Sequence, residues 1–241
     1  MYDLSTMTMS ELTRLGSDLR NLGASSASME ETAGRIVNYF YSRLIDPNTG
    51  RSSMALVRFF KIHDFDELDL DQREFATAFM AGEPIPPGMK CLTLLASRGD
   101  ESAWNSRSDS RAHKAIPLPS GDLVRQFPMI SSLIQQFGLE LNTVLKPDPN
   151  CLRDLNEKSY NVFHAPVAEG SAYIPAQEEF VKPYGIRSVL GFGGLLPSGD
   201  LFTIIMFSKV VVSTETAELL RPMTLNAKIA VLQHDGERIF S

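Results

Sequence analysis

The stretch from Ser188 to Ser208, SVLGFGGLLPSGDLFTIIMFS, decides the fold. It contains two apolar runs, Ser188–Leu196 and Leu201–Phe207, separated by Pro197-Ser198-Gly199-Asp200. Proline, serine, glycine and aspartate favour tight turns, so the stretch predicts a β-hairpin. Because both runs are apolar at consecutive positions, both faces of the hairpin are expected to be buried, which places it at the centre of a sheet.

A helix is expected directly after the hairpin. Ser213 is suited to the N-cap position, and Glu215 and Glu218 place negative charge in the electropositive first turns. The helical pattern continues to about Leu232 and is interrupted by Pro222.

The chain upstream of the hairpin alternates between strand and helix patterns. Ser28 and Glu31 form a capping-box pair before an amphipathic run that ends near Leu44. Further strands are expected at Met54–Ile62, Lys90–Arg98, Ala115–Leu118 and Tyr160–His164, and helices at Gln72–Met80, Gly121–Phe137 with a kink or break at Pro128, and Gln177–Val181. With no repeat and no linker, the pattern predicts one α/β (α+β) domain.

The first 27 residues are interpreted as an extension of that domain. Leu12, Leu15, Leu19 and Leu22 recur every three or four residues and predict an amphipathic helix. Gly16 and Gly23 lower its helix propensity, so it needs a partner surface, either the body of the chain or a second copy. The expected organisation is an extension over 1–27, a domain over 28–233 and a tail over 234–241.

Composition excludes several classes of partner. The 241 residues carry a formal net charge of −6, and the pI is about 5.3. A nucleic acid or an anionic membrane would favour a positive surface, so neither is expected as a partner. No apolar run is long enough to span a bilayer, and Met1 to Ser10 has no signal-peptide pattern. Cys91 and Cys151 are interpreted as reduced thiols, so a cytoplasmic protein is expected.

The sequence resembles GAF domains, which are related to PAS sensory domains. The resemblance rests on Tyr184-Gly185-Ile186-Arg187-Ser188-Val189-Leu190, the turn at Ser198-Gly199-Asp200, Phe207-Ser208 and the helix from Thr214. Ala55 to Ile62, Cys91 to Gly99 and Ala115 to Leu118 resemble the first two strands and the "iPl" segment of that family. The resemblance covers roughly Ser28 to Leu232 and implies a central antiparallel sheet with helices on its faces.

The resemblance also implies a role in signal transduction. GAF domains are sensory modules, often dimeric and commonly fused to histidine kinases of two-component systems, phosphatases, cyclases or transcription factors. No such output sequence is recognisable here. The sequence also lacks the NKFDE-like signature of cyclic-nucleotide-binding members and the cysteine–histidine neighbours of bilin-binding members. Those two ligand classes are therefore disfavoured, and the identity of the cofactor or ligand stays unknown.

A ligand in a GAF-like fold would lie between the sheet and the segments that cross it, here Gly99 to Lys114 and Ala165 to Pro183. Aromatic rings supply contact area in such pockets, and a few polar groups fix orientation. The expected ligand-binding residues are Trp104, Phe163, His164, Tyr173, Gln177, Phe180 and Tyr184. An ordinary hydrophobic core would explain most of these aromatics equally well.

Three other features admit two interpretations each. His164 ends a predicted strand and could be a heme ligand or a hydrogen-bonded strand-end histidine. Cys91 could be nucleophilic, as in GAF-fold enzymes that reduce free methionine sulfoxide, or a buried inert thiol. Gly191, Gly193 and Gly194 lie inside a strand and open no helix, so they indicate a close backbone or ligand approach and not a phosphate loop.

These observations favour a non-catalytic, small-molecule-sensing regulatory domain that signals through the terminal helices of a homodimer. The alternative is a ligandless module that only dimerises or docks a partner, such as a histidine kinase. A heme sensor and a thiol-dependent enzyme are the remaining hypotheses. No metal site is expected, because no pair of histidines has helical i, i+4 spacing.

Overall fold

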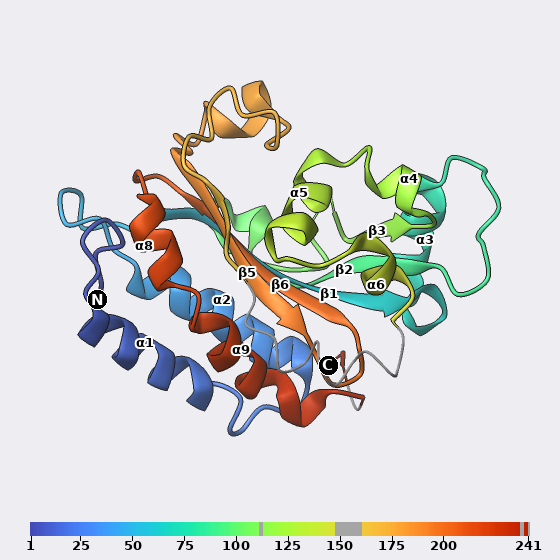
Figure 1. The fold of residues 1–241 in the computed structure, drawn as a ribbon, viewed down its shortest axis with the longest axis horizontal. Coiled ribbons are helices and arrows are strands. Elements are labelled where there is room, and N and C mark those ends of the chain that lie inside the picture. Colours follow the sequence, from blue (N-terminus) through green and yellow to red (C-terminus); the bar gives the residue numbers. More distant parts are fainter. Residues whose placement is uncertain (111–112, 148–160, 237–238, 241) are drawn as a thin grey trace.

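A computed structural model describes residues 1–110, 113–147, 161–236 and 239–240 of the chain. Its centre is a six-stranded antiparallel sheet with the strand order β3-β2-β1-β6-β5-β4 (Figure 1). The strands are β1 (Met54–Asp64), β2 (Lys90–Gly99), β3 (Ala115–Leu118), β4 (Phe163–Ala165), β5 (Ser188–Leu195) and β6 (Leu201–Ser208). The predicted α+β class and the antiparallel sheet are confirmed.

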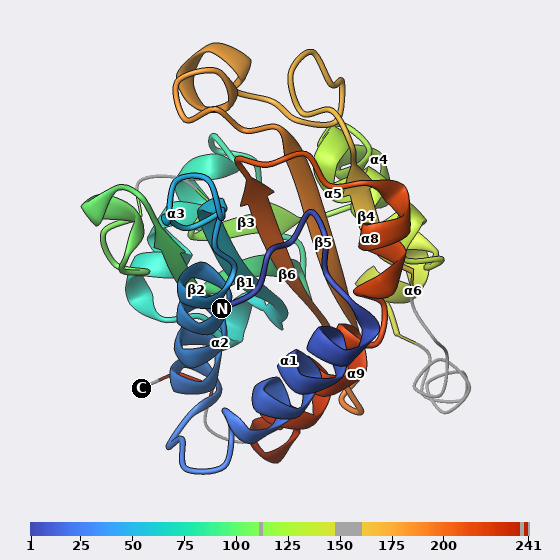
Figure 2. The same ribbon diagram turned by 90° about the vertical axis from the view of Figure 1, so that its left-hand side faces the viewer.

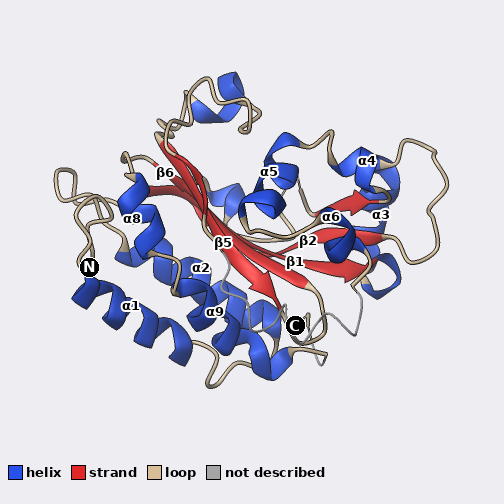
Figure 3. Ribbon diagram, in the orientation of Figure 1, coloured by secondary structure: helices blue, strands red, loops and turns tan. Residues whose placement is uncertain are grey.

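Helices cover both faces of this sheet (Figure 3). One face carries α1 (Met9–Asn21), α2 (Met29–Arg43), α8 (Thr214–Leu219) and α9 (Met223–Val231), which we call the terminal-helix face. The opposite face carries the short helices α4 (Gly121–Val124), α5 (Pro128–Gln136) and α6 (Leu141–Leu145). Helix α3 (Leu70–Phe79) packs beside β3 at the edge of the sheet. Within the described ranges, no helix is long and apolar enough to cross a membrane.

The predicted hairpin lies inside the sheet, where β6 neighbours β1 and β5 neighbours the edge strand β4. Strands β5 and β6 pair along their whole length, from Ser188 opposite Ser208 to Leu195 opposite Leu201. The turn is closed by Leu196 N, which donates to Asp200 O at 2.9 Å. A Cβ atom on Gly193 would lie 2.1 Å from the Phe202 carbonyl oxygen, so this glycine is required by a close backbone approach.

The expected helix boundaries are mostly confirmed. The predicted helix Gly121–Phe137 is divided into α4 and α5, because Pro128 occupies the first turn of α5, where its missing N–H leaves no bond unmade. The predicted C-terminal helix is divided at Pro222 into α8 and α9. The strand expected at Tyr160–His164 overlaps the observed β4 at Phe163 and His164 only, since 161 and 162 are not in a strand and Tyr160 lies outside the described residues.

The N-terminal segment forms the expected helix and packs on α9 of the same chain (Figure 2). Leu12, Leu15 and Leu19 are buried in this contact. A Cβ on Gly16 would lie 2.5 Å from the Asn226 side chain, and one on Gly23 would lie 2.0 Å from the Ala230 carbonyl oxygen. The two glycines therefore permit close helix packing, which offsets the helix propensity that they cost.

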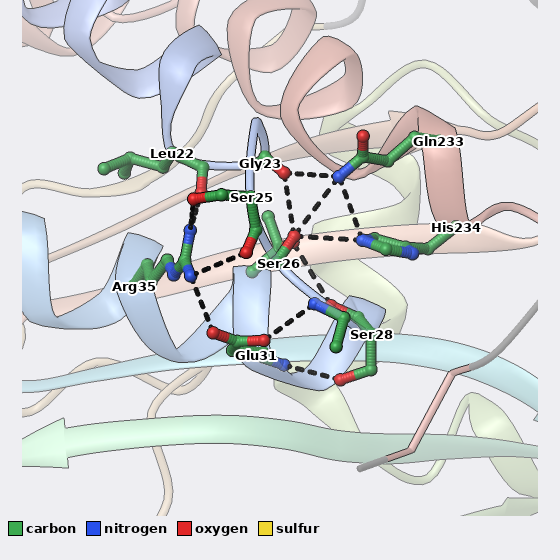
Figure 4. Close-up of polar contacts among 11 residues, drawn as sticks. Leu22, Gly23, Ser25, Ser26, Ser28, Glu31, Arg35, Gln233 and His234 are labelled. Carbon is green, nitrogen blue, oxygen red and sulfur yellow. Dashed lines mark hydrogen bonds and ion pairs between the residues drawn. The ribbon is translucent and has the colours of Figure 1, made fainter.

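A polar network joins the loop between α1 and α2 to the helical turn Leu232–His234 that follows α9 (Figure 4). Ser26 Oγ donates to Gly23 O at 2.8 Å and lies 2.9 Å from His234 Nε2. Arg35 donates to Leu22 O at 3.1 Å and pairs with Glu31 at 2.6 Å. The loop after α1 is thereby fixed both to α2 and to the helical turn that follows α9.

Candidate ligand-binding site

The sheet face that carries α4, α5 and α6 contains a row of directly paired residues, which we call the Arg58 row. Cross-strand partners point to the same side of a sheet, so pairing registers show which residues share a face. Arg58 on β1 pairs with Ser97 on β2 and Ile205 on β6. Ile205 pairs with Gly191, which pairs with Phe163 on β4. One arginine thus lies among small and apolar residues on a buried face.

Arg58 is a buried cation without a counter-charge. The residue is 9% exposed, and its Nε atom has no hydrogen-bond partner in the part of the chain that the structure describes. Among the described residues, no carboxylate forms an ion pair with it; its one polar neighbour is His113, with Nη1 lying 3.4 Å from Nδ1. Burial lowers the pKa of Arg58 to about 10, so the group stays charged at neutral pH. A buried charge without a partner is costly and therefore needs an explanation.

Two hydroxyl groups on the same face also have no hydrogen-bond partner within the described ranges. Ser97 Oγ lies in the Arg58 row. Thr203 Oγ1 lies in the adjacent row of the same face, because Thr203 pairs with Phe60, which is two residues after Arg58 on β1. Adjacent rows on one face are roughly 7 Å apart. Three polar groups on neighbouring strands therefore present unused hydrogen-bonding capacity on one side of the sheet.

An aromatic cluster covers the next row on the other side of Arg58. Trp104, Phe180 and Tyr184 are in mutual contact, with ring centroids 4.5 Å apart for Trp104 and Tyr184 and 5.5 Å apart for Trp104 and Phe180. Phe180 also meets Phe207, at 5.0 Å. Phe207 pairs with Leu56, two residues before Arg58 on β1. The structure thus brings together three of the seven residues expected from the sequence.

Four expected residues do not join that cluster. Phe163 is fully buried at the β4 end of the Arg58 row. Gln177 instead orders its own loop, since its side chain accepts from Gly170 N and donates to the Ala168 and Ile174 carbonyls. Tyr173 is 48% exposed.

His164 faces the opposite side of the sheet from Phe163. It pairs with Leu190, which belongs to the core under the terminal helices. Its Nε2 lies 3.0 Å from the Val212 carbonyl, and burial lowers its pKa. It lines a hollow of about 410 Å³ beside α8, together with Gln136 and Arg221. This geometry matches the hydrogen-bonded strand-end histidine of the two interpretations given above.

Cys91 has the environment of an inert thiol. It is fully buried on β2, opposite His63, and packs among Leu68, Ala76 and Met89. Burial raises the pKa of its thiol to about 12, which disfavours the thiolate that a nucleophile requires. Cys151 lies outside the described residues. Among the residues that are described, no three His, Cys, Asp or Glu side chains form a group that could hold a metal ion.

Sequence reasoning missed Arg58, Ser97 and Thr203. The available signal was a charged residue at position 5 of the apolar run Met54–Ile62, MALVRFFKI. A charge inside a strand that is buried on both sides is unusual. The serine and threonine carried no comparable signal, because both are common in strands and at their ends.

Comparisons with known proteins give the fold and no closer relationship. No family model matches the chain, and no curated protein matches it. A solved free methionine-R-sulfoxide reductase from Neisseria meningitidis, in complex with its substrate, superposes with a TM-score of 0.51 at 10% identity. The match covers 98% of this chain and 95% of that one.

A second solved structure is the GAF domain of a phosphoenolpyruvate-protein phosphotransferase from Coxiella burnetii. It has a TM-score of 0.47 at 10% identity, over 95% of this chain and 96% of that one. The superposition on the reductase and the six-stranded antiparallel sheet show that the chain has a GAF-like fold. At such low identities the likeness of this GAF-like domain to other proteins extends to the fold alone. Its function has to be argued from its own residues.

Proposed function

We propose that this GAF-like domain is a non-catalytic regulatory module that binds a small molecule over the Arg58 row. The observation that carries the proposal is the set of buried, unpartnered polar atoms of Arg58, Ser97 and Thr203 on one sheet face. Leaving such groups unsatisfied costs free energy, and a bound ligand would recover it. The aromatic cluster at the next row would supply flat contact area for that ligand.

The strands themselves could transmit occupancy to the terminal helices. Side chains alternate along β6, so Thr203 faces the proposed site while Phe202 and Ile204 belong to the core under the terminal helices. A ligand shifts an equilibrium only if it binds one arrangement better than another. Differential contacts at Thr203 and Arg58 would therefore have to change how β1 and β6 pack against α2 and α9.

A homodimer through the terminal helices is part of the proposal. Leu225, Ile229 and Leu232 have exposed fractions of 61%, 43% and 42% and follow one another at helical spacing. An exposed apolar stripe of this kind favours burial against another surface. The same stripe supports the second candidate function, a module that dimerises or docks a partner protein without binding any ligand.

The proposed absence of catalysis is supported by Cys91, whose buried thiol has a raised pKa. The opposite hypothesis, a thiol-dependent enzyme, requires that a Cys91→Ser variant lose its activity. We expect this variant to keep the oligomeric state and any ligand of the natural sequence.

Native mass spectrometry of the freshly purified protein, beside an absorption spectrum, tests the proposal. We expect a dimer that retains a small-molecule mass, a weaker ligand signal in Trp104→Ala, and an unchanged signal in Tyr173→Ala. Tyr173 is the matched control because it is an exposed aromatic residue outside the cluster. A ligand-free dimer that takes up nothing from a metabolite extract would support the interaction module instead. A Soret band would indicate heme, and His164→Ala would then be the next variant.

A further inference from the structure

We propose that the ligand of this site carries a single carboxylate group, which binds the guanidinium of Arg58. The inference rests on the function proposed above and adds the chemical class of the ligand and the residue that recognises it.

Two buried cations on one strand show why Arg58 is unusual. Lys61, three residues after Arg58 on β1, is 2% exposed, and its Nζ lies 2.6 Å from Asp200 Oδ2. Lys61 therefore has a carboxylate from the protein itself. Arg58 is also buried but has no such carboxylate among the described residues. The fold thus neutralises one buried cation internally and leaves the other for an external anion.

The free side of the guanidinium is suited to a carboxylate. Arg58 Nη1 lies 3.4 Å from His113 Nδ1, and Nε has no partner. The N–H groups of Nε and Nη2 lie parallel on one edge of a guanidinium and can donate to both oxygens of a carboxylate. The Ser97 hydroxyl, directly across the β1–β2 pair, can donate one further hydrogen bond.

Charge balance favours a monoanion over a phosphate. The described residues paired in the Arg58 row, Ser97, Ile205, Gly191 and Phe163, are uncharged. Protonation of His113 would place a second positive charge beside the guanidinium, and repulsion between the two charges disfavours it. One cation can neutralise one carboxylate, whereas a phosphate dianion would keep an uncompensated charge in a buried site.

The test uses the full chain and three variants. Arg58→Met removes the charge and keeps the length, Arg58→Lys keeps the charge and loses the two-point contact, and Arg125→Met is the control. Arg125 is exposed and pairs with Asp122. Native mass spectrometry measures the retained ligand, and methyl esterification of the released ligand counts its carboxyl groups. Far-UV circular dichroism and thermal unfolding establish that each variant folds.

The expected result is a ligand with one esterifiable group that is lost from Arg58→Met, weakened in Arg58→Lys and retained in Arg125→Met. Where nothing co-purifies, benzoate is the probe: it should raise the thermal midpoint of the natural sequence relative to chloride at equal ionic strength. The apparent affinity for benzoate should fall about tenfold or more in Arg58→Met.

Two outcomes would overturn the inference. A ligand without a carboxylate, or one that Arg58→Met retains, refutes the role of Arg58 but leaves the proposed sensory function intact. A natural-sequence protein that retains no ligand and gains no stability with benzoate refutes the carboxylate site and also counts against the sensory function.

Discussion

The two faces of the sheet differ in how their buried charges are paired and in how closely the elements pack. On the terminal-helix face, Lys61 has Asp200 as its partner, and Gly23 lets α1 approach α9 until no side chain fits between them. On the opposite face, Arg58, Ser97 and Thr203 have polar atoms without partners. The terminal-helix face thus neutralises its buried lysine within the chain, whereas the buried arginine of the opposite face has no carboxylate partner among the described residues, and our proposal assigns that role to a ligand.

The largest expected effect is at the aromatic contact under the terminal helices. Phe40 on α2 is fully buried and meets Phe192 edge to face, with ring centroids 5.6 Å apart. Phe40→Ala should lower the free energy of unfolding by about 3–5 kcal/mol, measured by urea denaturation. Tyr184→Ala, in the half-buried cluster of the other face, should cost about 1 kcal/mol in the ligand-free protein. Equal losses at the two positions would contradict the comparison.

The next effect concerns the close approach of α1 and α9. A Cβ on Gly23 would lie 2.0 Å from the Ala230 carbonyl oxygen, which is backbone and cannot rotate away. Gly23→Ala should therefore destabilise the protein by about 2–3 kcal/mol. Gly34→Ala is the matched control: Gly34 lies inside α2 with nothing within 4 Å of its added Cβ, so alanine should stabilise by about 0.5–1 kcal/mol. A neutral Gly23→Ala would show that the two helices can separate without cost.

Elements whose signals are local were predictable from the sequence. The hairpin depends on a turn between adjacent apolar runs, and the helices depend on caps and periodicity within a few residues, as at Ser28 and Ser213. Trp104, Phe180 and Tyr184 were expected at one site because the segments that cross the sheet could be identified.

The sequence could not show which of two buried cations has a carboxylate partner, because that depends on which distant residue the fold brings close to each. In the sequence, Arg58 and Lys61 are two similar cations in one apolar run. They differ only because Asp200, 139 positions after Lys61, reaches one and not the other. The faces of β2 were also unpredictable, because a register shift between Phe59 and Phe60 inserts an extra residue and reverses the alternation beyond it.

His63 is an exception on the terminal-helix face and sharpens the comparison. The residue is 1% exposed, neither ring nitrogen has a hydrogen-bond partner among the residues that the structure describes, and the Phe240 ring centroid lies 5.5 Å from that of His63. Burial, with smaller contributions from the charges of Lys61 and Lys90, lowers the pKa of His63 well below 6.5.

The sign of the pH effect follows from this lowered pKa. Below about pH 6.5 the unfolded chain binds a proton that the folded chain does not, so stability falls as the pH falls, by up to about 1.4 kcal/mol per pH unit. His63→Leu should reduce this dependence between about pH 6.5 and pH 5.5, a range above the titration of most carboxylates, and leave the part that comes from His113 and His164, whose pKa values are also lowered by burial. The check is urea denaturation of both proteins across that range. The same slope in both would assign the proton to His113 or His164 alone.

The smallest expected effect compares the two faces most directly, because the same threonine-to-valine substitution is made on each. Thr32 on α2 is fully buried, and its Oγ1 donates to Ser28 O at 3.2 Å and lies 2.5 Å from Ser26 Oγ. Thr203 is equally buried, but its Oγ1 has no partner. Exchanging threonine for valine removes one hydroxyl and keeps the branched shape.

Thr32→Val should therefore cost about 1 kcal/mol, since it leaves the Ser28 carbonyl without this donor. Thr203→Val should be neutral or stabilising by up to about 1 kcal/mol in the ligand-free protein, because a hydroxyl without a partner contributes nothing to folding. Urea denaturation of the two variants measures the difference. A loss in Thr203→Val as large as in Thr32→Val would mean that the hydroxyl is already satisfied in solution, and the opposite face would then need no ligand to complete it.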